Sequence, residues 1–153
     1  MAAPRVRPLL LVDVDGVLLV VGGWDEDGDG GYKPSYVPEA GEMLRRLSAD
    51  FELHWATTWE ASANVEIAPA LGLPPLPFVR FDFDYRARTP KLRSVMAHVG
   101  DRPCAWIDDD LGADAVAWAA GRSVPTLLVH ADPAEGMARR HVDELREFAA
   151  SLG

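Results

Sequence analysis

Residues 9–18 read Leu9-Leu10-Leu11-Val12-Asp13-Val14-Asp15-Gly16-Val17-Leu18, an apolar run that two aspartates interrupt. A strand that is buried on both faces of a parallel sheet has this apolar composition. Side chains alternate along a strand, so Asp13 and Asp15 should point the same way, and parallel α/β sheets bind ligands at the carboxyl ends of their strands. The stretch therefore predicts a buried strand that ends at a functional site.

The closeness of Asp13 and Asp15 has an electrostatic consequence. Two like charges about 4 Å apart repel by roughly 4 kcal/mol at an effective dielectric of about 20. A divalent cation or a shared proton would offset this repulsion. The alternative interpretation is that both aspartates are solvated turn residues, because Asp commonly follows strands. The rest of the chain favours the functional interpretation.

The composition is that of an ordinary globular protein. The chain has 153 residues, of which 48% are hydrophobic, and a formal net charge of −9. A chain of this length buries about 68–70% of its unfolded surface, so we expect a single domain over residues 1–153. Cys104 is the single cysteine, which excludes an internal disulfide. The net charge disfavours non-specific binding to nucleic acid or to an anionic membrane.

The N-terminal apolar run is too short for a membrane span or a signal peptide, because Asp13 and Asp15 interrupt it after a few residues. We therefore expect a cytoplasmic protein with no membrane partner. One segment reverses the local charge: between residues 80 and 93, five basic residues outnumber two acidic ones. The basic residues are Arg80, Arg86, Arg88, Lys91 and Arg93. This segment is a natural place for an anion, although the arginines would also make a loop soluble.

Apolar runs and helical patterns alternate along the chain. The expected strands are at about 8–14, 51–56, 78–83, 104–107 and 124–129, and the expected helices at about 38–49, 59–68, 90–99, 112–120 and over the final residues from Val142 to Leu152. Extended residues 16–21 and a Gly- and Asp-rich segment, 22–31, indicate a flap insert at about 17–37. The pattern predicts an α/β fold: a doubly wound, Rossmann-like parallel sheet of about five strands with helices on both faces and no large cap domain.

Polar clusters directly follow three of these strands. They are Asp13 with Asp15, Thr57 with Thr58, and Asp108 with Asp109 and Asp110. The carboxyl ends of parallel strands meet at one edge of a sheet, so we expect the three clusters to lie together.

These clusters, with one lysine, resemble the four short motifs of the haloacid dehalogenase (HAD) superfamily of phosphohydrolases. Residues 13–17, Asp-Val-Asp-Gly-Val, are similar to the first motif, Thr57 to the second, Lys91 to the third, and Asp108-Asp109 to the fourth. The resemblance covers nearly the whole chain. It is nearest to small capless members, among them the HAD domain associated with RNA repair proteins.

The resemblance implies a Mg²⁺-dependent phosphatase. Asp13 would be the nucleophile that forms an aspartyl-phosphate, and Asp15 would protonate the leaving oxygen and then activate water. Thr57 would hydrogen-bond a phosphoryl oxygen. Lys91 would add its charge to the helix N-terminal amides that bind anions, unless it is a solvated surface lysine. Thr58 and Arg88 are expected to contact the substrate.

The resemblance also implies a set of metal ligands. Mg²⁺ would be held by Asp13, the main-chain carbonyl of Asp15 and Asp109, and Asp108 would be able to share the ligation. Asp109 is the first choice because four residues separate it from Asp114, which is one of the family's fourth-motif spacings.

The acid at Asp15 favours phosphoryl transfer over dehalogenation, since dehalogenases of the superfamily generally lack an acid there. Capless members tend to act on large or exposed phosphorylated substrates, or use an oligomer partner as the lid. A nucleotide, a nucleic-acid end or another exposed phosphate is therefore the expected substrate, and an oligomer is compatible with the sequence. The contrasting hypothesis is a catalytically idle domain that binds metal or phosphate and serves as an interaction module.

Three polar residues also match helix-capping patterns. Thr89 precedes Pro90 as an N-cap, Thr57 begins a capping box that ends at Glu60, and Asp110 is placed to cap the next helix. Residues 25–30 match the start of an EF-hand loop, but position 12 would be a tyrosine instead of a glutamate. Four aromatic residues would line an entrance or pack in the core: Trp24, Tyr32, Tyr36 and Trp59.

Overall fold

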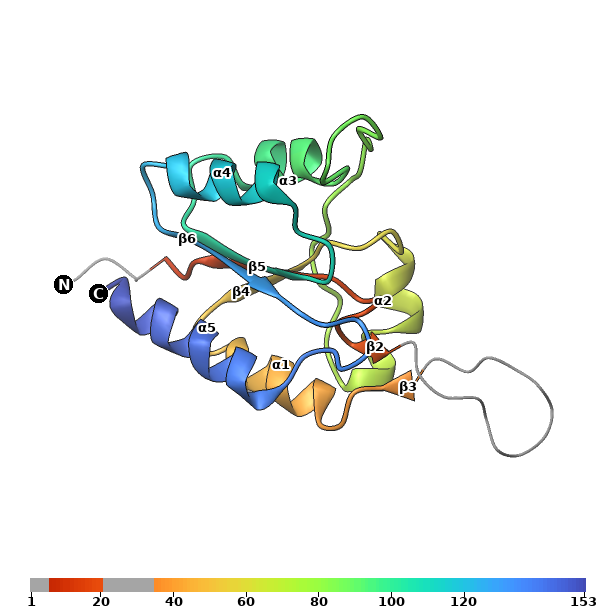
Figure 1. Ribbon diagram of the computed structural model, residues 1–153. Helices are drawn as coiled ribbons and strands as arrows, with labels where there is room; N and C mark the ends of the chain where they lie inside the picture. The colour runs from red at the N-terminus through yellow and green to blue at the C-terminus, as the bar shows by residue number, and fades with distance from the viewer. Residues whose placement is uncertain (1–5, 21–34) are drawn as a thin grey trace.

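Four parallel strands form the central sheet of the computed structural model, which describes residues 6–20 and 35–153 (Figure 1). The strands lie in the order β4-β1-β5-β6. Their bounds are Leu9–Val12 for β1, Glu52–Trp55 for β4, Cys104–Asp108 for β5 and Thr126–His130 for β6. The chain thus moves outward from β1 to β4, then returns across β1 to β5 and β6, which makes the sheet doubly wound.

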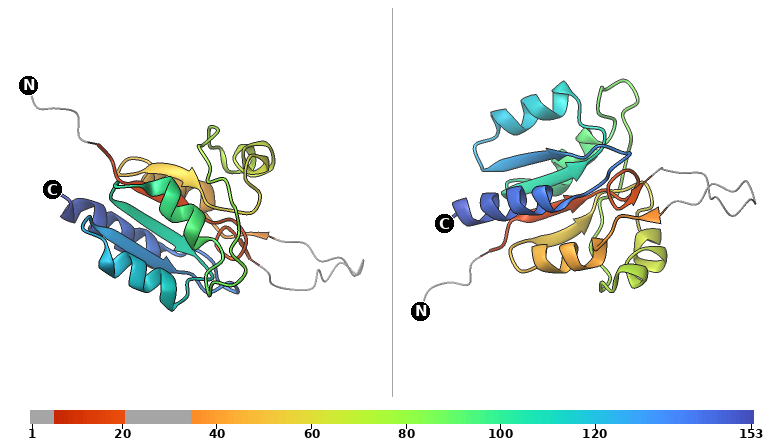
Figure 2. Two further views of the ribbon diagram at one scale, coloured as in Figure 1. Left: turned by 90° about the horizontal axis from the view of Figure 1, so that it is seen from above. Right: turned by 60° about the horizontal axis from the view of Figure 1, so that its bottom comes forward.

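Helices cover both faces of the sheet, α1 and α5 on one side and α3 and α4 on the other (Figures 1 and 2). Their bounds are Ala40–Leu47 for α1, Leu92–Val99 for α3, Ala113–Gly121 for α4 and Arg139–Ser151 for α5. A short helix, α2 at Ser62–Glu66, and a 3-10 turn, η1 at Pro69–Leu71, follow β4. The predicted α/β fold class is confirmed.

The alternation of β1 explains why the fold has two cores. Leu10 and Val12 pack with apolar residues of α1 and α5, whereas Leu9 and Leu11 pack with those of α3 and α4. All four side chains are buried because β1 has a hydrogen-bonded strand on each side and helices over each face. Residues 9–12 are therefore apolar at every position, which is the pattern of a central parallel strand.

The sheet has four strands among the described residues instead of about five, because residues 78–83 do not form one. Only a single parallel bridge, Trp55 to Phe78, joins this segment to β4. Beyond it, the amide of Phe81 donates to the Glu60 carboxylate at 2.7 Å, and the amide of Asp82 donates to the Ser94 hydroxyl at 2.8 Å. Side chains thus take the donors that a strand ladder needs.

A two-stranded antiparallel ladder follows the first strand. It joins β2, Leu19–Val20, to β3, Ser35–Tyr36. The expected extended stretch begins late because residues 16–18 turn back, with the amides of Leu18 and Leu19 both donating to the carbonyl of Val14. The centre of the predicted flap, including the EF-hand-like residues 25–30 and the aromatic residues Trp24 and Tyr32, lies outside the described residues.

No helix in the described ranges 6–20 and 35–153 is both long enough and apolar enough to cross a lipid bilayer.

Candidate active site

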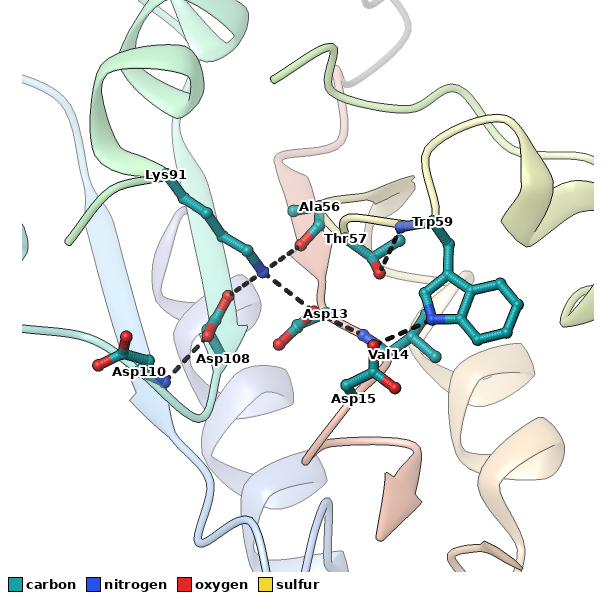
Figure 3. Close-up of polar contacts among 9 residues, drawn as sticks. All are labelled: Asp13, Val14, Asp15, Ala56, Thr57, Trp59, Lys91, Asp108 and Asp110. Atoms are coloured by element: carbon teal, nitrogen blue, oxygen red, sulfur yellow. Dashed lines mark hydrogen bonds and ion pairs between the residues drawn. The ribbon is translucent and has the colours of Figure 1, made fainter. Parts of the chain in front are cut away.

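The three polar clusters come together at the carboxyl edge of the sheet (Figure 3). Asp13 directly follows β1, Thr57 follows β4, and Asp108 is the last residue of β5. A pocket of about 390 Å³ opens at this edge, and its lining includes Asp13, Asp15, Lys91, Asp108 and Asp109. Segments that are almost one hundred residues apart in the chain therefore share one cavity, because parallel strands all end at the same edge.

Lys91 connects all three strands. Its Nζ lies 3.0 Å from Asp13 Oδ1 and 2.9 Å from Asp108 Oδ2, and it donates to the carbonyl of Ala56 at 3.0 Å. The side chain of Lys91 is 15% exposed, and those of Asp13 and Asp108 are 5% and 1% exposed. Lys91 is thus not a solvated surface lysine. It lies in the turn directly before α3 and extends to the sheet edge (Figure 3).

Burial dominates the electrostatics of Asp13. It raises the pKa of Asp13 well above the ordinary range, and the nearby charge of Asp108 raises it further, although Lys91 acts in the opposite direction. The amide of Val14 also donates to Asp13 Oδ1 at 2.8 Å. Burial alone would lower the pKa of Lys91, but Asp13 and Asp108 outweigh it and the pKa of Lys91 is raised. One ammonium faces two carboxyl groups, so a further cation at this centre would favour the ionised form of Asp13.

Asp109 adds a third carboxylate to this centre. One carboxylate oxygen from each of Asp13, Asp108 and Asp109 lies within 4.8 Å of the other two. Burial raises the pKa of Asp109, and the charge of Asp108 adds to the effect. Gly16 leaves the room for Asp109: its φ is 80°, and a Cβ there would be 2.6 Å from Asp109 Cγ. Three clustered carboxylates with one ammonium fit a divalent cation that prefers oxygen ligands.

Asp15 lies at the exposed rim of the pocket and is held by a tryptophan. The indole Nε1–H of Trp59 donates to Asp15 Oδ2 at 3.0 Å (Figure 3). The indole N–H of Trp59 thus reaches the rim of the site, whereas the side chain packs against the main apolar core and is not in the pocket lining. Tyr36 is on β3 and is not among the pocket-lining residues.

The two threonines and the arginine expected at the site have different positions. Thr57 is buried, and its Oγ1 accepts a hydrogen bond from the amide of Trp59 at 3.2 Å. Thr58 lines the pocket. Arg88 is not in the pocket lining, but its Nη1 lies 2.8 Å from Oδ1 of Asp110. Asp110 does line the pocket. The capping box is incomplete, because the Glu60 carboxylate accepts from the amide of Phe81 instead of that of Thr57.

Two further capping interpretations are wrong. Thr89 does not cap α3: its Oγ1 donates to Asp114 Oδ1 at 2.6 Å and accepts from the amide of Gly112 at 2.8 Å. Asp110 does not cap α4, whose N-cap is Gly112 without a side-chain cap. The amide of Asp110 instead donates to Asp108 Oδ1 at 2.9 Å, which orients the carboxylate that Lys91 contacts.

Sequence reasoning missed four lining residues: Phe83, Tyr85, Thr89 and Pro90. In the sequence, aromatic residues alternate with aspartates from Phe81 to Tyr85, a pattern that does not by itself indicate a pocket. The prediction for this segment was a strand at about 78–83, which did not include Tyr85 and did not indicate a site.

The model of one protein family matches residues 9–142 of the chain. This family is described as the HAD domain in Swiss Army Knife RNA repair proteins. No curated protein matches the chain. Among solved structures, the chain is similar to a hypothetical protein of Xanthomonas campestris, with 18% identity and a TM-score of 0.54 over 95% of this chain and 85% of that one. It is also similar to a protein of Vibrio cholerae assigned as a 3-deoxy-D-manno-octulosonate 8-phosphate phosphatase, with 17% identity and a TM-score of 0.50 over 96% and 87%. These two likenesses show the fold.

Proposed function

The chain belongs to the family of HAD domains in Swiss Army Knife RNA repair proteins, and so to the HAD superfamily of phosphohydrolases, and on this premise we propose that it is a Mg²⁺-dependent phosphatase with Asp13 as its nucleophile. One observation carries the proposal. Lys91 joins Asp13 to Asp108 while Asp109 completes a cluster of three carboxylates, all in the lining of one pocket. A scaffold without chemistry has no need to bury this much like charge.

In the proposed first step, a carboxylate oxygen of Asp13 attacks phosphorus. The bond between phosphorus and the ester oxygen breaks, the leaving oxygen takes a proton from Asp15, and the products are an alcohol and an aspartyl-phosphate. Lys91 and the amide of Val14 hold Asp13 Oδ1, which fixes the orientation of the nucleophile. This orientation reduces the entropic cost of attack.

In the second step, Asp15 removes a proton from water, and the water oxygen attacks the same phosphorus. The phosphoryl bond to Asp13 breaks, which releases inorganic phosphate and restores the carboxylate. The position of Asp15 at the exposed rim supports both transfers, since it has access to solvent. The Trp59 indole holds one of its oxygens and leaves the other for the proton.

Asp13, Asp108 and Asp109, with the main-chain carbonyl of Asp15, would hold Mg²⁺, which would neutralise charge on the transferring phosphoryl group. Lys91 would bind a phosphoryl oxygen while it keeps its contacts with Asp13 and Asp108. Thr57 would donate a hydrogen bond from its hydroxyl to a phosphoryl oxygen. Thr58, in the pocket lining, and Arg88, paired with the rim residue Asp110, would contact the substrate.

The proposed substrate is a phosphate monoester of a nucleotide, a nucleic-acid end or another exposed phosphate. Support comes from the family description, which places such domains in RNA repair proteins, and from the exposed rim residues Thr58, Tyr85 and Asp110. A cytoplasmic location and an oligomer partner that closes the pocket stay predictions.

Phosphate release from p-nitrophenyl phosphate with and without Mg²⁺ tests the proposal. We expect turnover that EDTA abolishes, that Asp13→Asn lowers by at least about a thousandfold, and that the matched surface variant Asp143→Asn leaves unchanged. Turnover that Asp13→Asn does not reduce would contradict the proposal. Metal binding without turnover would favour the catalytically idle module.

A further inference from the structure

Three aromatic rings form a row beside the proposed active site. The rings of Phe81 and Phe83 are stacked, with centroids 5.1 Å apart and planes 9° from parallel. The ring of Tyr85 follows, 5.8 Å from that of Phe83 and tilted by 35°. The inner end of the row reaches the centre of the site, because Lys91 Nζ lies 5.6 Å from the centroid of Phe81.

Hydrogen bonds from two sides hold the segment that carries the row. The amide of Asp82 donates to Ser94 Oγ on α3 at 2.8 Å, and the amide of Asp84 donates to the carbonyl of Pro90 at 3.1 Å. The amide of Phe81 is held by Glu60, as described above. The segment is neither helix nor strand, yet successive anchors fix it, so the rings are presented in a set orientation. Such preorganisation reduces the entropic cost of binding a ligand.

The outer end of the row is open. Tyr85 is 82% exposed, although its ring and that of Phe83 line the same pocket as Asp13 and Lys91. A ring that stacks on one side and faces solvent on the other offers an aromatic face to a ligand. A phosphate at Asp13 would therefore place the rest of a substrate molecule within the pocket that these two rings line.

The charges around the row favour a nucleotide over a neutral aromatic compound. Lys91 supplies positive charge at the inner end of the row. Arg80 and Arg86 are exposed and lie outside the pocket lining, with the Arg80 guanidinium over the ring of Phe78. Planar rings next to a lysine that faces a proposed phosphate site suit a base attached to a phosphorylated sugar, since bases stack on aromatic side chains. The pocket volume of about 390 Å³ lies in the range of small-molecule sites.

We propose that Phe83 and Tyr85 form the leaving-group subsite, where the base of a nucleoside monophosphate stacks while its phosphate occupies the site at Asp13. The inference rests on the proposed function and deepens it, because it names the residues that select the leaving group. It assigns selectivity for a base to a segment that carries none of the four motifs.

The kinetic test compares two phosphate monoesters that differ in the base. We expect kcat/KM for adenosine 5′-monophosphate to exceed that for ribose 5-phosphate. Tyr85→Ala should lower the ratio of the two kcat/KM values by about tenfold, the effect of losing one base–aromatic stack, mainly through a higher KM for the nucleotide. Tyr85→Phe, which retains the ring, should restore the ratio. Met96→Ala, an exposed apolar residue on α3 outside the pocket lining, is the matched control and should leave the ratio unchanged.

A binding measurement separates this inference from the proposed function. In the Asp13→Asn background, calorimetry should give a lower Kd for adenosine 5′-monophosphate than for ribose 5-phosphate, and Tyr85→Ala should remove most of the difference. Absence of turnover in the wild-type protein together with this binding pattern would contradict the phosphatase and keep the subsite.

Three results would overturn the subsite. The first is turnover in which Tyr85→Ala does not change the ratio of kcat/KM for adenosine 5′-monophosphate to kcat/KM for ribose 5-phosphate. The second is equal affinity of the Asp13→Asn protein for the two esters. The third is a kcat/KM for O-phosphotyrosine that exceeds the value for the nucleotide, with Tyr85→Ala lowering both values by the same factor. This result would assign the rings to an aryl phosphate instead of a base.

Discussion

Asp114 accepts two hydrogen bonds from Thr89, one from the amide at 2.9 Å and one from the hydroxyl at 2.6 Å. This contact ties the turn that carries Lys91 to the start of α4, directly after the Asp108–Asp110 cluster. Asp114→Ala would leave the buried donors of Thr89 without this acceptor. We expect the free energy of unfolding to fall by about 2 kcal/mol in urea titrations, and kcat to fall because Lys91 shifts. The surface variant Asp143→Ala should change the free energy by less than about 0.5 kcal/mol. Equal stability of the two variants would contradict this role for Asp114.

Gly16 is required both for its backbone conformation and for space. Gly16→Ala would place a Cβ at a φ of 80° and against the Asp109 carboxylate. The matched control is Gly72→Ala, also at a positive φ of 68°, where the new Cβ meets only the end of the Arg45 side chain. Both variants should lose about 1–2 kcal/mol of stability from backbone strain. Calorimetry with Mg²⁺ should show weaker binding in Gly16→Ala alone. Unchanged Mg²⁺ affinity in that variant would exclude Asp109 from the metal site.

Lys91 compensates buried negative charge, so its removal should be costly. Lys91→Met would leave Asp13 and Asp108 buried without their cation, and we expect the free energy of unfolding to fall by about 3 kcal/mol at pH 7. Added Mg²⁺ should recover part of this loss, because it would supply the missing positive charge. Arg93→Met removes an exposed basic residue that pairs with Asp82 and should cost less than about 1 kcal/mol. Urea titrations with and without Mg²⁺ measure each value. A loss in Lys91→Met no larger than that in Arg93→Met would contradict the electrostatic account.

A pair formed by buried His54 and half-buried His98 should make stability depend on pH. Burial lowers the pKa of His54, although Glu52 acts in the opposite direction, and burial also lowers the pKa of His98, whose Nε2 lies 2.8 Å from His54 Nδ1. As the pH falls, these histidines are therefore protonated in the unfolded chain at a higher pH than in the folded protein. The stability from these neutral rings is fully present above about pH 6.5 and is lost as the pH falls through the lower folded values.

Urea titrations between pH 5 and pH 7.5 test this sign. The wild-type protein should lose more stability on acidification than His54→Gln, which keeps a polar side chain that does not titrate. The difference between the two proteins excludes the contribution of carboxylates that they share. Equal slopes in the two proteins would show that burial of His54 has no effect on the pH dependence.

The sequence predicted the strands that end at the site, because apolar residues 9–12 and 104–107 are typical of central parallel strands and polar residues follow them at once. The convergence of Asp13, Thr57 and Asp108 followed from the same topology, whereas Lys91 was expected there only from the resemblance to the HAD motifs. The roles expected of these residues in catalysis and metal binding stay predictions that the experiments above test.

Two of the failures share one physical cause, which is a side chain from a distant segment. Thr89 has the pattern of an N-cap, but its hydroxyl bonds Asp114, twenty-five residues further along. Residues 78–83 were expected to form a strand, but Glu60 and Ser94 accept hydrogen bonds from the amides of Phe81 and Asp82. Local patterns carry no information about such tertiary partners, so the aromatic row over the pocket could not be predicted from the sequence.

The central claim is that Asp13 takes up the phosphoryl group, and a crystal structure of the protein with Mg²⁺ and beryllium fluoride tests it most directly. We predict trifluoroberyllate bonded to a carboxylate oxygen of Asp13, with Mg²⁺ bound by Asp13, Asp108 and Asp109. Trifluoroberyllate on any other side chain, or a Mg²⁺ site away from these three carboxylates, would contradict the account.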